Sequence, residues 1–186
     1  MQTSTVFAAL AAQLLLAPAG WAHGASADHG HAAGDAPSPD PAATWRLGDL
    51  TLETPYARAT LPNAPVAGGF LSITNNGAAD DRLIAAASAI AARAEIHEMT
   101  MNGDVMTMRA LADGLPIPAG ETVALQPGGY HIMFLQLTGP LVQGETVDVT
   151  LTFAEAGEIT VPLSVLAFNA RAAGDAPQGA DAHAGH

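Results

Sequence analysis

Residues 94–111, AEIHEMTMNGDVMTMRAL, carry the strongest local fold signal in this chain of 186 residues. Apolar and polar side chains alternate on both sides of Asn102 and Gly103. An Asn-Gly pair between two alternating runs is typical of a tight β-hairpin, because both residues accept the positive φ that two-residue turns require. The stretch therefore predicts two antiparallel strands joined at Asn102-Gly103.

The hairpin also predicts which side chains face each other. Directly opposed residues have Cβ atoms about 4.5–5.5 Å apart, close enough for an imidazole nitrogen and a thioether sulfur to reach one ion. The pairs expected from a loop at Asn102-Gly103 are Met101 with Asp104, Met99 with Met106, and His97 with Met108. We therefore expect His97 and Met108 to form half of a metal site.

A second half-site is expected in the run HIMFLQL, residues 131–137. His131 and Met133 are two positions apart on a predicted strand, so both side chains project from the same face. Every methionine after Met1 falls between residues 97 and 133, together with the two histidines that lie outside the terminal segments. Thioether and imidazole ligands together favour Cu(I). The predicted ligands are His97, Met108, His131 and Met133, with Met99 and Met106 as secondary candidates.

Short runs of β-type alternation recur along residues 45–168, separated by Gly, Pro and Asn. This spacing is typical of an all-β sandwich. Residues 83–94 have helical propensity from alanine, but their length and neighbours favour strands. The expected strands are 46–53, 67–74, 81–87, 93–101, 104–111, 121–126, 131–138, 145–153 and 158–166.

Composition divides the chain into a domain, residues 45–168, and three flanking segments. Residues 1–22 contain a short apolar run followed by small residues, which predicts a signal peptide cleaved after Ala22 or, alternatively, after Ala27. Because the first five residues carry no Lys or Arg, a retained amphipathic anchor is the alternative to cleavage. Residues 23–44 and 169–186 lack apolar periodicity, so we expect both to be disordered. Their histidines are secondary candidates for binding Cu(II), zinc or nickel: His23, His29, His31, His183 and His186.

Charge and composition exclude several function classes. The formal net charge is −12 and the chain has no lysine, so it cannot assemble a basic patch for nucleic acid or an anionic membrane. It has no cysteine, which excludes a thiolate nucleophile and the cysteine ligand of a blue-copper site. No Gly-x-Ser-x-Gly motif is present, and Glu95 and Glu98 have no evident partners for acid–base work. We expect a binding protein, not an enzyme, with no membrane span after processing.

The runs AEIHEMTMNGDVMTMRAL and GLPIPAGETVALQPGGYHIMFLQL, residues 114–137, resemble the periplasmic copper chaperone family PCuAC. The resemblance covers residues 45–168 and includes the order His97, Met108, His131, Met133. It implies a cupredoxin-like Greek-key β-sandwich with a solvent-accessible Cu(I) site at those four residues. It also implies a periplasmic carrier that supplies copper for cytochrome oxidase assembly, with a Sco-type copper chaperone and the copper-bearing oxidase subunit as partners.

A rival interpretation keeps the periplasmic location and changes the ligands. The chain would bind zinc, nickel or copper through its histidine tails, and the methionines would pack in the core. Metal preference separates the two interpretations, since zinc does not need thioether ligands.

If the tails capture Cu(II), a shortened chain running from Trp45 to Phe168 will load less Cu(II) than the full chain, because it lacks the five tail imidazoles. Copper content after incubation and gel filtration measures the difference. Equal loading of the two chains would remove the capture role from the tails.

Overall fold

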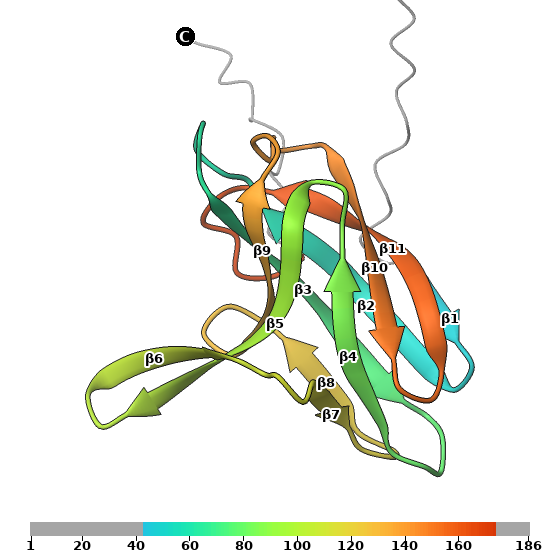
Figure 1. Ribbon diagram of the computed structural model, residues 1–186. Coiled ribbons are helices and arrows are strands. Elements are labelled where there is room, and N and C mark those ends of the chain that lie inside the picture. Colours follow the sequence, from blue (N-terminus) through green and yellow to red (C-terminus); the bar gives the residue numbers. More distant parts are fainter. Residues whose placement is uncertain (1–42, 174–186) are drawn as a thin grey trace, which may run out of the picture. The chain divides into compact units, whose positions relative to one another are not determined.

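The computed structural model describes residues 43–173, and within this range every regular element is a β-strand (Figure 1). The strands are β1 Thr44–Leu47, β2 Leu50–Arg58, β3 Val66–Asn75, β4 Asp81–Ala87, β5 Ala91–Asn102, β6 Val105–Ala110, β7 Leu115–Ile117, β8 Thr122–Leu125, β9 Tyr130–Leu137, β10 Thr146–Phe153 and β11 Gly157–Leu166. The all-β prediction is confirmed, including strands rather than a helix over residues 83–94. The Greek-key order stays a prediction.

Two details differ from the expected strands. The expected strand 46–53 is interrupted at Gly48, whose φ of 56° turns the chain, so it becomes the antiparallel pair β1 and β2. The short strand β7 was not predicted, because three residues around Pro116 are too few to display an alternating pattern. Its two flanking side chains, Leu115 and Ile117, are nevertheless buried in the core.

The strands pair into one sheet that closes on itself around the core. Hydrogen-bonded neighbours follow the order β6-β5-β9-β8-β3-β2-β11-β10-β4-β7, and β4 pairs with β5 as well as with β10. Strand β9 also pairs directly with β3. The pairings therefore form a ring through β5, β9, β3, β2, β11, β10 and β4, which leaves the sheet with an inner and an outer face.

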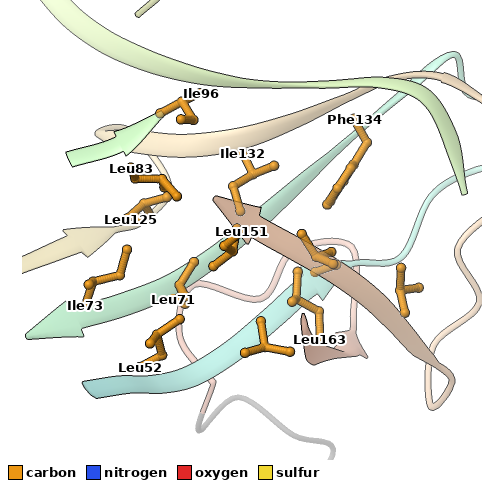
Figure 2. Close-up of a cluster of buried hydrophobic side chains, with 14 of the residues drawn as sticks. Leu52, Leu71, Ile73, Leu83, Ile96, Leu125, Ile132, Phe134, Leu151 and Leu163 are labelled. Carbon is orange, nitrogen blue, oxygen red and sulfur yellow. The ribbon is translucent and has the colours of Figure 1, made fainter. Parts of the chain in front are cut away.

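The core is built from alternate residues of these strands, as period-two patterns require. On β10, Val147, Val149, Leu151 and Phe153 are buried while the residues between them point outward. Figure 2 shows Ile96 of β5 and Ile132 of β9 in the same buried cluster as Leu71, Leu151 and Leu163. Because side chains alternate, the residues next to Ile96 and Ile132 belong to the outer face.

One hairpin extends beyond the ring. Among the described strands β6 pairs with β5 alone, and all six of its residues are exposed. The end of the β5–β6 hairpin projects away from the other strands (Figure 1). We call residues 99–108 the arm. Its side chains pack little against the core. Burial in the core therefore does not explain why methionines occupy this hairpin.

Gly69 of β3 allows the core to close against β9. A Cβ atom there would lie 2.9 Å from the Phe134 ring and 3.0 Å from a Leu163 methyl group. We expect Gly69→Ala to lower the free energy of unfolding by about 1–3 kcal/mol, because overpacking forces neighbours to shift. Gly139→Ala is the matched control, since a Cβ there meets nothing within 4 Å. Urea unfolding of both variants measures the difference, and equal stabilities would contradict the proposed close contact.

Candidate metal centre

The pairing of β5 with β9 brings two histidines together on the outer face. Ile96 lies opposite Ile132 in the core, and the next residues, His97 and His131, therefore lie opposite each other outside it. Their ring centroids are 5.7 Å apart, with an angle of 53° between the ring planes. His131 is buried, and the His97 side chain is only 12% exposed. The two predicted histidine ligands are thus direct neighbours.

The predicted register of the β5–β6 hairpin is wrong by two positions. Asn102 remains in the strand and pairs with Val105, so Gly103, with a φ of 63°, and Asp104 form the loop. The observed pairs are Met101 with Met106, Met99 with Met108, and His97 with Ala110. A slip of two positions changes each partner but keeps every side chain on its face, because side chains alternate with a period of two.

The corrected register makes Met108 a diagonal neighbour of His97 instead of its direct partner, and diagonal neighbours lie about 7–8 Å apart, still within reach of a long side chain. Met133 is the other diagonal neighbour, since it lies opposite Glu95 on the β5–β9 pair. The four predicted ligands therefore share one face, with the histidines adjacent and one methionine on each side of His97. For both sulfurs to reach one ion, the flexible methionine side chains have to converge on the histidine pair.

Each histidine has one ring nitrogen engaged and the other available. The Nε2 atom of His97 donates to Oε2 of Glu95 at 2.9 Å, and its Nδ1 is buried without a hydrogen-bond partner. The Nδ1 atom of His131 donates to the Gly129 carbonyl at 3.1 Å, and within residues 43–173 its Nε2 makes no hydrogen bond. A ligating histidine commonly donates its second N–H to a carboxylate or a backbone carbonyl in this way. The orphaned nitrogen of His97 therefore fits a metal ligand.

Glu95 was not predicted to take part in the site. Its carboxylate accepts from His97 and lies 3.4 Å from the Arg93 guanidinium, and the hydrogen bond from His97 keeps the pKa of this carboxyl low. The spacing of two residues on one strand was the signal available in the sequence, since it places Glu95 and His97 on the same face. Glu95 fixes the orientation of His97 and holds the proton on Nε2.

The turn before β9 fixes His131. The Gly129 carbonyl accepts from the His131 ring and also from the backbone N–H of Met99 at 3.1 Å. Burial lowers the pKa of His131, against the smaller opposing effect of the Gly129 hydrogen bond, and the nearby His97 lowers it further. The imidazole is therefore held neutral near pH 7, which is the form that binds a metal ion.

The methionines are not core residues. Met101, Met106 and Met108 are 61%, 55% and 47% exposed, and Met99 and Met133 are half-buried. The interpretation that these side chains pack in the core is therefore wrong. Within residues 43–173, no three or more His, Asp or Glu side chains are grouped to hold a metal ion. The tail candidates His23, His29, His31, His183 and His186 lie outside the described residues.

Met133 also borders an open space on the outer face. It lies opposite Gly68 of β3, which has no side chain. A Cβ atom on Gly68 would lie 2.9 Å from the Phe70 ring. A hollow of about 330 Å³ is lined by Met133, Gly68 and Phe168 among other residues. The thioether of Met133 is thus reachable from solvent on the side away from His97.

Solved structures of PCuAC domains share this fold. The copper-bound PCuAC domain from PmoF2 is 26% identical, with a TM-score of 0.58 over 67% of this chain and 98% of that domain. The apo PCuAC domain from PmoF1 has the same identity and TM-score over 67% and 99%. The Cu(I) form of DR1885 from Deinococcus radiodurans is 26% identical, with a TM-score of 0.51 over 70% and 84%. The domain is PCuAC-like, as its sequence predicted.

The chain belongs to the family described as "Putative lipoprotein LpqE-like", whose model matches residues 50–165. A relative, "Putative lipoprotein Lxx21020" of Leifsonia xyli subsp. xyli (strain CTCB07), is 34% identical over 100 residues. That match covers 54% of this chain and 60% of the relative. No helix among the described residues is long and apolar enough to cross a membrane.

Acidification should destabilise the metal-free domain through His131. Because burial lowers its folded pKa below the ordinary 6.5, the unfolded chain binds more protons between the two values. Stability therefore falls as the pH drops below about 6.5, by at most about 1.4 kcal/mol per pH unit for one proton. Glu95, whose pKa lies below 4.5, stays charged between pH 7 and about 5.5 and adds no slope there.

Urea unfolding between about pH 8 and pH 5.5 measures this slope, and His131→Gln should reduce it even if the variant is less stable at every pH. An unchanged slope in His131→Gln would assign the pH dependence to other groups.

Proposed function

We propose that this protein is an exported Cu(I) carrier that holds one ion at His97, Met108, His131 and Met133. The observation that carries the proposal is a pair of opposed histidines, buried His131 and half-buried His97, whose ring centroids are 5.7 Å apart. The strand register places the thioethers of Met108 and Met133 on the same face as this pair. Neutral imidazole and thioether ligands suit a soft monovalent ion. The copper-bound PCuAC domain and the Cu(I) form of DR1885 support copper as the cargo.

The geometry suits an ion that is passed on, not one kept permanently. The histidines are held in place by Glu95 and Gly129, whereas Met108 stands on the arm with 47% of its surface exposed. Thioethers are neutral, weakly donating ligands. An incoming ligand would therefore displace Met108 first, while the two imidazoles keep the ion bound until a second ligand from the acceptor arrives.

The proposal also includes a cellular location and two partner proteins. The family description as lipoproteins and the apolar run near the amino terminus support export to the periplasm. We propose a Sco-type copper chaperone and the copper-bearing subunit of cytochrome oxidase as partners, on the strength of the resemblance to PCuAC. The site has no evident arrangement for acid–base or nucleophilic chemistry, so the proposed role is transport and not catalysis.

Anaerobic titration with Cu(I) in competition with a chromogenic chelator tests the site. We expect one tight equivalent, and Met108→Leu with Met133→Leu should weaken it by about 100-fold or more, because two of four ligands are lost. Zn(II) should bind more weakly and should respond little to the double substitution, since zinc does not need thioethers.

Val142→Leu serves as the control, since Val142 is 50% exposed and is none of the predicted ligands. Tight Cu(I) binding that survives the double methionine substitution would reject the proposed ligand set. Zn(II) binding in preference to Cu(I) would instead favour the histidine tails.

A further inference from the structure

The arm carries a second pair of methionines that the four-ligand site does not use. Met101 of β5 and Met106 of β6 are directly opposed, so their Cβ atoms lie about 4.5–5.5 Å apart. Each thioether sits at the end of a chain with three rotatable bonds, which lets both sulfurs turn toward one ion. This pairing follows from the observed register and was absent from the one predicted.

These two side chains lie beyond the supporting strand. The pairing of β5 with β9 reaches only as far as Glu98 and Tyr130, so no third strand from the described part of the chain flanks Met101 and Met106. They are 61% and 55% exposed, although burying a methionine side chain is worth about 1.5–3 kcal/mol. Fold stability therefore gives no reason for methionine at these two positions, whereas access to solvent is what a surface ligand needs.

The charged pair at the base of the arm, Glu98 and Arg109, lies on the face opposite the methionines. Glu98 and Arg109 are opposed, and Arg109 donates to Glu98 at 2.6 and 2.9 Å. Both alternate with His97 and Met108, so the guanidinium does not lie on the methionine face. The face with Met101 and Met106 continues instead through the pair Met99 and Met108 to His97, with no cation between them.

We propose that Met101 and Met106 form a second, weaker Cu(I) site, made of thioethers alone, at the outer end of the methionine row that leads to His97. This inference rests on the proposed function, because it assumes that the ion carried by the protein is Cu(I). Without an imidazole the second site should bind at least about tenfold more weakly than the first. A weak outer site exposed to solvent would be the first to meet an arriving ion and the first to release it.

The test follows the methionine methyl groups of the full-length protein, labelled with ¹³C, by NMR during anaerobic titration with Cu(I). Single Met→Leu variants assign the signals. We expect the Met108 and Met133 methyl signals to shift with the first equivalent, and those of Met101 and Met106 to shift mainly with a second. In Met101→Leu with Met106→Leu the first equivalent should remain and the weaker uptake on the arm should disappear.

Val105→Leu is the matched control, because Val105 is 66% exposed on the same hairpin and pairs with Asn102 on the opposite face. It should titrate like the parent, and thermal unfolding checks that all variants are folded. If the Met101 and Met106 signals do not respond to Cu(I), or if their substitution leaves the stoichiometry unchanged, the second site does not exist.

The two proposals fail in different ways. Loss of the tight equivalent in Met108→Leu with Met133→Leu, together with retained weak binding at Met101 and Met106, supports both. If the tight equivalent persists in that variant, the proposed carrier site is wrong whatever the arm does. Because the histidine tails are common to every variant, binding to them cancels in each comparison.

Discussion

The register between β5 and β9 is the constraint on which the site depends. Ile96 and Ile132 are both buried in the core, and a shift of either strand by one residue would bring a polar side chain inward. The same register places His97 against His131 on the outside. Core packing therefore determines that the two imidazoles oppose each other on the outer face.

Around this fixed pair, the remaining groups differ in rigidity. Glu95 and the Gly129 carbonyl hold one nitrogen of each ring, so the free nitrogens keep a defined position before any ion arrives. The two thioethers differ from each other: Met133 is half-buried on β9, whereas Met108 is 47% exposed on β6, which among the described strands pairs with β5 alone. Two imidazoles held by hydrogen bonds, beside a solvent-exposed thioether at Met108, combine ligands for a soft ion with a position open to ligand exchange.

Much of this arrangement could be predicted from local sequence pattern. Alternation along residues 94–111 and 131–137 identified the strands and the faces of all four predicted ligands, because the period of two is independent of the exact register. The pairing itself could not be predicted, since Asn102-Gly103 and Gly103-Asp104 are both acceptable loops and only the three-dimensional fold chooses between them. Ligand chemistry placed His97 and His131 in one predicted site, but their direct pairing across β5 and β9 could not be predicted, because the pairing of strands distant in sequence is set when the sheet closes.

The carbonyl of Gly129 has a consequence beyond the orientation of one ring. Its oxygen accepts both the His131 imidazole N–H and the backbone N–H of Met99, where the arm begins. One oxygen atom therefore helps to set both the direction in which the arm leaves the closed sheet and the tilt of the His131 imidazole. The first residue of the arm and the imidazole of His131 share one anchor, and a shift of the Gly129 oxygen would alter both hydrogen bonds together.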